Sequence, residues 1–106
     1  MALQLTSDNF QKEVLESKIP VLVDFYADWC GPCKMMSPVV EAVAGTYTGR
    51  LKVGKLNVDD AQDIAAEYGV MSIPTFIFFK DGEVAHKTVG AVTKEAFEAE
   101  IEHVIG

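Results

Sequence analysis

The sequence predicts an α/β fold in which a mixed β-sheet carries helices on both faces. Strand-like and helix-like segments alternate along most of the chain, and a hairpin and a last helix follow them. Residues 21–27 are largely apolar at both alternating sets of positions and include the β-branched Val21 and Val23, which is typical of a central strand covered on both sides. Strands joined by helices should run parallel, and the strands of the hairpin antiparallel.

The first half of the chain is predicted to form two strands and two helices. Residues 3–5 are a short strand candidate, and Thr6 is a favourable N-cap for a helix over about 7–17. After the central strand, a helical pattern extends over about 32–44. Pro38 lies inside this pattern and is expected to kink the helix without a chemical role.

The second half begins with a predicted strand over 51–58. Asp60 can cap a short helix after this strand, and Gly69 is a favourable residue just beyond the end of that helix. Residues 75–79 form a third strong strand candidate.

A hairpin and a helix complete the predicted fold. Asp81 and Gly82 predict a tight turn from the third strong strand into a strand over 83–89. Thr93 can cap the last helix. The apolar residues of that helix share one face: Phe97, Ile101, Val104 and Ile105.

Composition and charge exclude several classes of function. The chain has 106 residues, the size of one domain, and a formal net charge of −7 without a cluster of Lys or Arg. Nucleic acid and anionic membranes are therefore not expected as partners. No apolar run could span a bilayer, and residues 1–4 lack the features of a signal peptide. A cytoplasmic location is expected, with a processed mature form as the alternative.

The chain has two cysteines, Cys30 and Cys33, which lie three positions apart. A disulfide between them closes a loop too small to stabilise the fold much, so a redox role explains the pair better than a structural disulfide does. Two alternatives stay open at this point. One is half of a zinc site, although no second cysteine pair exists and His86 and His103 lie far along the chain; the other is a pair of inert core residues. No metal is expected.

The cysteine pair lies where a buried strand ends and a helix begins. Backbone N–H groups and the positive end of the helix dipole stabilise a thiolate there, and the thiolate is the nucleophilic form of cysteine. Cys30 precedes the helix and is the expected attacker, with the more exposed sulfur. Cys33 lies about one turn further and is expected to resolve the mixed disulfide from a more shielded position. Gly31 permits the close approach of another backbone, and Pro32 suits the first turn of a helix.

Six motifs occur in the chain in the following order: Val23-Asp24-Phe25, Trp29-Cys30-Gly31-Pro32-Cys33-Lys34, Lys55-Leu56-Asn57-Val58-Asp59, Ile73-Pro74-Thr75, Phe79-Lys80-Asp81-Gly82 and Val89-Gly90-Ala91. Through these motifs the chain resembles the thioredoxin family over essentially its whole length. The resemblance implies a five-stranded mixed sheet flanked by four helices in a single domain over 1–106. It also implies a protein-disulfide reductase that works by dithiol-disulfide exchange and needs no cofactor beyond its redox-active disulfide.

The resemblance also assigns catalytic residues besides the two cysteines. Asp24 resembles the buried family aspartate that exchanges a proton, through water, with Cys33, and Lys55 joins it in the catalytic group. The alternative is a structural carboxylate in the core that is paired with Lys55. Because helices should cover both faces of the central strand, we expect burial to raise the pKa of Asp24 more than Lys55 lowers it.

A flat apolar surface around Cys30 is implied by the same resemblance. Pro74 resembles the cis proline of the family, and its missing N–H leaves Ile73 to present backbone groups to an extended substrate. For Trp29 taken alone, packing in the core is an equal alternative. Tyr26 departs from the family pattern, because many members carry tryptophan there. The implied substrate-binding residues are Trp29, Gly31, Pro32, Ile73, Pro74, Gly90 and Ala91.

The expected function is therefore the reduction of disulfides in target proteins by a monomer that receives its electrons from a thioredoxin reductase. An oxidant or isomerase on the same fold is one alternative, although such proteins usually carry histidine at the position of Pro32. A binding subunit that works without redox chemistry is a second alternative, which the intact cysteines make an additional role rather than a replacement.

Overall fold

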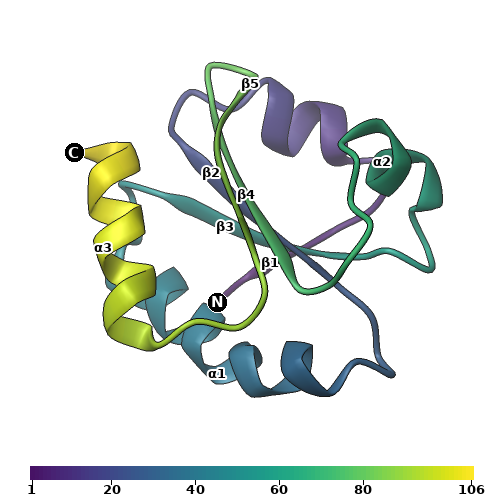
Figure 1. Ribbon diagram of the computed structural model, residues 1–106. Coiled ribbons are helices and arrows are strands. Elements are labelled where there is room, and N and C mark those ends of the chain that lie inside the picture. The colour runs from purple at the N-terminus through teal and green to yellow at the C-terminus, as the bar shows by residue number, and fades with distance from the viewer.

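The computed structural model describes all residues, 1–106, and has a five-stranded sheet at its centre (Figure 1). The strands are β1 (Leu3–Leu5), β2 (Val21–Tyr26), β3 (Lys52–Asn57), β4 (Thr75–Lys80) and β5 (Glu83–Val89). Their order in the sheet is β1-β3-β2-β4-β5. β1, β3 and β2 are parallel, whereas β4 is antiparallel to β2 and β5 is antiparallel to β4. The predicted mixed sheet is confirmed.

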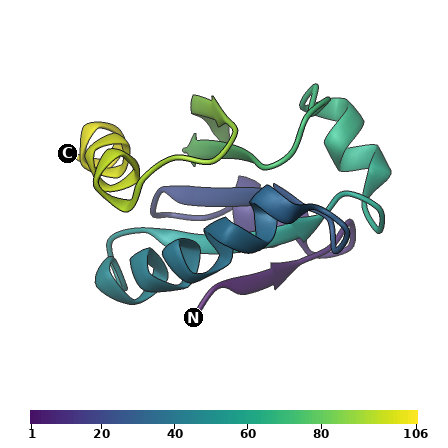
Figure 2. The same ribbon diagram turned by 60° about the horizontal axis from the view of Figure 1, so that its bottom comes forward.

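Four helical segments cover the sheet. They are η1 (Gln11–Leu15), α1 (Gly31–Thr46), α2 (Gln62–Glu67) and α3 (Lys94–Ile105). Residues of α1 and α3 share one hydrophobic cluster with the sheet, and residues of η1 and α2 share the other, so the helices lie on two faces (Figure 2). None of these helices combines the length and the apolar character that crossing a membrane requires.

Side chains of the central strand β2 alternate between the two hydrophobic clusters on the two faces of the sheet. Leu22 packs with Val40 of α1 and Phe97 of α3, while Val23 packs in the opposite cluster with Val14 of η1. This alternation is the one that the sequence predicted for a doubly covered strand. It places position 24, two residues after Leu22, on the same α1 side of the sheet. That side therefore surrounds the site described below.

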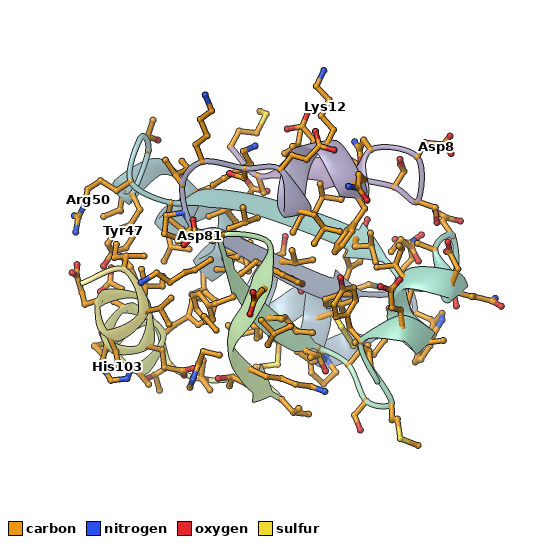
Figure 3. All side chains as sticks on the ribbon, turned by 90° about the horizontal axis from the view of Figure 1, so that it is seen from above. Asp8, Lys12, Tyr47, Arg50, Asp81 and His103 are labelled. Carbon is orange, nitrogen blue, oxygen red and sulfur yellow. A yellow bond between two sulfur atoms is a disulfide. The ribbon has the colours of Figure 1, made fainter.

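Side chains at the end of α1 join this helix to α3. The Tyr47 hydroxyl donates a hydrogen bond of 2.9 Å to Glu102 of α3, and the Arg50 guanidinium lies 5.4 Å from the centre of the Tyr47 ring (Figure 3). The Tyr47 side chain is buried, and burial together with Glu102 raises the pKa of its hydroxyl. Together with the apolar contacts, the Tyr47–Glu102 hydrogen bond fixes the far end of the helix that carries the cysteines.

The first helix differs from its prediction in type and length. Thr6 Oγ1 accepts a hydrogen bond from the Asn9 N–H, and Asn9 Oδ1 accepts one from the Thr6 N–H, so Thr6 closes the turn before the helix. The N-cap of η1 is Phe10, without a side-chain hydrogen bond, so Thr6 is not the N-cap that was predicted. The regular segment η1 is nevertheless a short π-helix, in which the Glu16 N–H bonds to the Gln11 carbonyl five residues back. The predicted helix over 7–17 is thus shorter and more widely wound than expected.

The start of α2 corrects a second prediction. Its N-cap is Ala61, which has no side chain able to accept a hydrogen bond, so the predicted cap by Asp60 is wrong. The Asn57 carbonyl instead accepts the N–H groups of both Asp60 and Ala61. This backbone turn starts the helix one residue later than predicted and leaves the Asp60 side chain free.

Several other local signals formed as predicted. Gly69 has a φ of +66°, and the hydrogen bonds of its N–H and of the Val70 N–H close the end of α2 on Ala66 and Ala65. Thr93 caps α3 by accepting a hydrogen bond from the N–H of Ala96, the third residue of the helix. α1 continues as one helix from Gly31 to Thr46 with a proline inside it.

The turn between β4 and β5 is formed by Asp81 and Gly82, with φ values of +54° and +81°. Two successive residues with positive φ are the geometry of the tight hairpin turn that the sequence predicted. A Cβ on Gly82 would lie 2.8 Å from the Leu15 carbonyl oxygen, so this position requires glycine for space as well as for conformation.

Candidate active site

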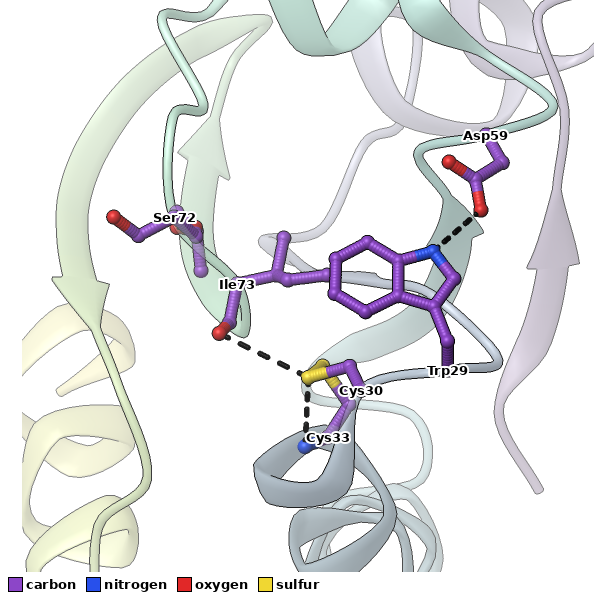
Figure 4. The surroundings of a disulfide bond; sticks show 7 residues. Trp29, Cys30, Cys33, Asp59, Ser72 and Ile73 are labelled. Atoms are coloured by element: carbon purple, nitrogen blue, oxygen red, sulfur yellow. Dashed lines mark hydrogen bonds between the residues drawn. A yellow bond between two sulfur atoms is a disulfide. The ribbon is translucent and has the colours of Figure 1, made fainter.

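The two cysteines lie at the start of α1 and form a disulfide bond (Figure 4). Cys30 is the N-cap residue of the helix, and Cys33 is in its first turn, with 5.3 Å between their Cα atoms. The Cys33 N–H donates a hydrogen bond of 3.2 Å to Cys30 Sγ. Gly31 and Pro32 open the helix between them, where a proline costs no backbone hydrogen bond.

The exposure of the two cysteines differs from the prediction. Cys30 is 4% exposed and Cys33 is 5% exposed, so the attacking residue is not the more exposed one in this disulfide form. The reason is that both side chains belong to one small apolar cluster, against which Tyr26 and Ile73 pack. The asymmetry between the sulfurs lies instead in the hydrogen bond that Cys30 Sγ receives from the helix.

Asp24 is buried beneath this pair on the α1 side of β2, with 1% of its surface exposed. Burial raises the pKa of Asp24 from 3.8 to about 7, against the opposing effect of the Lys55 ammonium. Asp24 and Lys55 are direct neighbours across β2 and β3, yet they form no ion pair within 4.0 Å, and Asp24 Oδ1 has no hydrogen-bond partner. The prediction that burial prevails is confirmed, and the alternative of a tight Asp24–Lys55 pair is wrong.

A cavity of about 130 Å³ connects this carboxylate with the second cysteine. It is large enough for water and has polar groups on its wall, which are the two conditions for a water-mediated proton path. Sequence reasoning anticipated Asp24, Cys33 and Lys55 here but not the polar residues that complete the wall. The lining residues are Asp24, Tyr26, Ala27, Asp28, Cys33, Lys34, Ser37 and Lys55.

Trp29 lies beside the disulfide with 70% of its surface exposed, so the alternative of core packing is wrong for this residue. Its indole Nε1–H donates a hydrogen bond of 2.9 Å to the Asp59 carboxylate (Figure 4). The Asp59 N–H in turn donates to the side chain of Asn57 at the end of β3. Sequence reasoning did not assign Asp59 to the site, although it closes one of the motifs quoted above.

The loop before β4 brings a third segment to the disulfide. The Ile73–Pro74 peptide bond is cis, as the resemblance implies, and the Ile73 carbonyl oxygen lies 3.9 Å from Cys30 Sγ. The Gly90 N–H donates a hydrogen bond of 2.8 Å to the Pro74 carbonyl, and Gly90 has a φ of +98°. The residues after β5, which include Ala91, are thereby held beside Pro74.

The site is therefore assembled from four separate parts of the chain. The segment from β2 to the start of α1 supplies Asp24, Trp29 and the cysteines. β3 and the residues after it supply Lys55 and Asp59, the loop before β4 supplies Ile73 and Pro74, and the loop after β5 supplies Gly90 and Ala91. No group of three or more His, Cys, Asp or Glu side chains is arranged to hold a metal ion. The chemistry available to these residues is thiolate attack and proton transfer at a disulfide.

Comparisons with known proteins agree with this geometry. The thioredoxin family model matches residues 1–103. The chain is 50% identical over 102 residues to a thioredoxin of Porphyra purpurea, which covers 96% of this chain and 95% of that protein. It is 50% identical over 97 residues to a thioredoxin of Pseudomonas aeruginosa, with 92% and 90% covered. It is 47% identical over 98 residues to a chloroplastic M-type thioredoxin of Chlamydomonas reinhardtii, with 92% and 70% covered.

Proposed function

This chain belongs to the thioredoxin family and is a thiol-disulfide oxidoreductase, and we propose how its residues divide the reduction of a target disulfide. Cys30 attacks the target, and Cys33 resolves the mixed disulfide. The observation that carries this assignment is the hydrogen bond of 3.2 Å from the Cys33 N–H to Cys30 Sγ at the start of α1. A donor in that position favours the thiolate form of the sulfur that receives it.

The reaction consists of two exchanges. The Cys30 thiolate of the reduced protein attacks one sulfur of the target disulfide, whose S–S bond breaks as the mixed disulfide forms; the other target sulfur leaves as a thiolate and takes a proton. Cys33 then loses its proton and attacks Cys30 Sγ, and the mixed disulfide breaks to release the second target thiolate, which is also protonated. Two electrons pass to the target, and the Cys30–Cys33 disulfide remains.

We assign the proton of Cys33 to Asp24 in the second exchange. Support comes from the cavity that both residues line and from the burial that raises the pKa of Asp24 to about 7. A carboxyl group with such a pKa can take up and return a proton near neutral pH. Lys55 lines the same cavity, and its positive charge favours the carboxylate form of Asp24.

Target binding is assigned to the surface around Cys30. Support comes from the exposed Trp29 ring and from the Ile73 carbonyl oxygen, 3.9 Å from Cys30 Sγ, which can accept a backbone hydrogen bond from an extended target segment. Pro74 has no N–H that would compete for such a bond. The remaining proposed contacts are Gly31, Pro32, Gly90 and Ala91.

The proposal also covers the partners and the setting of the reaction. The targets are proteins that contain disulfides, and a thioredoxin reductase returns two electrons to the Cys30–Cys33 disulfide. Residues 1–106 act as one domain and as a monomer, in the cytoplasm, where thiols are kept reduced. A net charge of −7 supports the expectation that neither nucleic acid nor an anionic membrane is a partner.

Reduction of insulin by dithiothreitol tests the proposed function, because the released B chain precipitates. The wild-type chain should accelerate precipitation, and Cys30→Ser should abolish the acceleration. Thr46→Ser, at the exposed far end of α1, is the matched control and should behave as the wild type. A wild-type chain that leaves the rate at the level of dithiothreitol alone would instead indicate a binding subunit without reductase activity.

A further inference from the structure

Four neighbouring side chains lie on the α1 side of the sheet: those of Gln4, Asp24, Tyr26 and Lys55. Gln4 of β1, Lys55 of β3 and Asp24 of β2 are successive neighbours across three parallel strands. Tyr26 lies two residues beyond Asp24 on β2, so its side chain is on the same face. Tyr26 is also the residue at which the chain departs from the tryptophan of many family members.

The aromatic ring of Tyr26 holds the ammonium group of Lys55. Lys55 Nζ lies 4.9 Å from the centre of the Tyr26 ring, within the range of a cation–π contact. The Tyr26 hydroxyl and the side-chain amide of Gln4 are 3.2 Å apart, and the same amide donates to the Lys55 carbonyl. Gln4 thus ties the outer end of the tyrosine ring to the edge of the sheet.

This arrangement competes with an ion pair between Lys55 and Asp24. The two residues are neighbours in register, and a lysine side chain is long enough to reach across the roughly 4.8 Å between adjacent strands. The structure nevertheless has no Lys55–Asp24 ion pair within 4.0 Å and no hydrogen bond from Lys55 Nζ to the protein, while Asp24 Oδ1 has no partner. The partner that the ammonium has is the ring of Tyr26.

We propose that Tyr26 is a positioning residue whose ring holds the Lys55 ammonium off the Asp24 carboxylate. The carboxyl group is thereby left free to exchange the proton of Cys33 and is not fixed as the anion of an ion pair. The inference rests on the proposed role of Asp24 in proton transfer, and it assigns the regulation of that role to a residue that neither exchanges electrons nor takes up the proton.

Other charged groups face the same cavity and must be considered. Asp28 follows β2, Lys34 and Cys33 belong to α1, and β4 places the uncharged Phe76 beside Asp24. None of these residues has a hydrogen bond or an ion pair with Tyr26. Replacing the ring therefore changes the position of Lys55 while the other charges stay in place, so that an effect on Asp24 can be traced to Lys55.

The direct test is the pH titration of the Asp24 carboxyl carbon by NMR in the oxidised protein. Tyr26→Leu removes the ring and should lower the midpoint by about 0.5 pH unit or more, because the ammonium approaches the carboxylate. Tyr26→Met, which keeps more of the side-chain length, should do the same and serves if the leucine variant does not fold. Tyr26→Phe and Tyr26→Trp keep an aromatic ring and should leave the midpoint within about 0.2 pH unit.

A second background isolates the contribution of Lys55. In Lys55→Gln the ammonium is absent, so adding Tyr26→Leu should no longer lower the Asp24 midpoint. An equal decrease in both backgrounds, an unchanged midpoint or an increase in the Tyr26→Leu single variant would each overturn the proposal. The titration does not depend on turnover, so it is separate from the failure of Asp24 as a proton acceptor, which insulin reduction by Asp24→Asn would reveal. If both inferences hold, the pH profile of insulin reduction by Tyr26→Leu should shift in the same direction as the titration.

Discussion

The backbone N–H of Cys33 donates a hydrogen bond to the sulfur of Cys30 across 3.2 Å. No such donor reaches the Cys33 sulfur, although the two cysteines are almost equally exposed, at 4% and 5%. In the reduced protein this N–H and the dipole of α1 favour negative charge on Cys30. The proposed order of attack thus rests on the direction of a hydrogen bond at a helix start and not on solvent access in the oxidised form.

Trapping of targets tests this order. Cys33→Ser should accumulate mixed disulfides with proteins of a cell lysate, because Cys30 can attack but nothing resolves the product. Cys30→Ser is the matched control and should trap few proteins, since the remaining thiol lacks the helix hydrogen bond. The adducts are counted by mass spectrometry after non-reducing separation. Equal trapping by the two variants would contradict the assigned order.

The redox potential tests the direction of electron flow. Thioredoxins have potentials of roughly −270 mV, a value that belongs to the family and is expected here through membership, against roughly −180 mV for protein disulfide isomerase. Pro32→His should raise the potential, because an imidazole beside Cys30 stabilises its thiolate. Met35→His adds the same group at an exposed position further along α1 and should have a smaller effect. A wild-type potential near the isomerase value, measured against glutathione, would mean that the protein is an oxidant.

Asp24→Asn tests the stability cost of the buried carboxyl group. Burial raises the folded-state pKa from 3.8 to about 7, so the folded protein binds the proton more tightly than the unfolded chain. The stabilisation is complete below about pH 4 and is lost as the pH rises through about 7; three pKa units set an upper bound of roughly 4 kcal/mol. Since the amide is itself a buried polar group, Asp24→Asn should stabilise the oxidised protein at pH 8 by roughly 1–3 kcal/mol.

Denaturant melts from pH 4 to pH 8 measure this dependence. Asp28→Asn removes a carboxylate that lines the same cavity but is exposed, and its stability should follow the wild type across this range. Asp24→Asn should also reduce insulin more slowly, because Cys33 loses its proton acceptor. A variant that is less stable at pH 8 and equally fast would make Asp24 a structural residue.

The hydrogen bond from Trp29 to Asp59 predicts a role for Asp59 in target binding. Asp59→Ala should free the indole and raise the KM for a protein target about threefold to tenfold, with little change in kcat, because an exposed hydrogen bond to a charged group is lost. Trp29 is the only tryptophan, so its fluorescence reports this change directly. Asp60→Ala alters an adjacent exposed carboxylate that has no contact with Trp29 and serves as the control. A shifted spectrum with an unchanged KM would show that the orientation of Trp29 does not matter for binding.

Two glycines should respond in opposite directions to alanine. Gly82→Ala should destabilise the protein by about 1–3 kcal/mol, because φ is +81° and the new Cβ would lie 2.8 Å from the Leu15 carbonyl oxygen. Gly45→Ala should stabilise it by about 0.5–1 kcal/mol, since Gly45 is inside α1 with open space around it. Denaturant unfolding of the two variants measures both effects, and a neutral Gly82→Ala would mean that the turn can adopt another conformation.

The sequence by itself determined the features that depend on local backbone preferences. Asp81 and Gly82 tolerate positive φ, Gly69 ends a helix and Thr93 begins one, and each did so in the structure. The cysteine pair at a strand end and helix start was also predictable, because both elements have strong local patterns. The predicted cap at Asp60 is wrong. The carbonyl of Asn57, which lies before the helix, accepts the N–H groups of Asp60 and Ala61, so α2 has Ala61 as its N-cap and begins one residue later than predicted.

Only the tertiary structure decided how separate segments act on one another. It placed the Asp59 carboxylate at the Trp29 indole N–H, gave the two cysteines almost equal exposure and set the Lys55 ammonium against the Tyr26 ring rather than against Asp24. These outcomes depend on distances between β2, β3 and the loops around them, and a side chain with two available partners takes the one that the packed sheet brings within reach. Local sequence preferences contain no information about that competition, because burial and charge at a point are set by residues far apart in the chain.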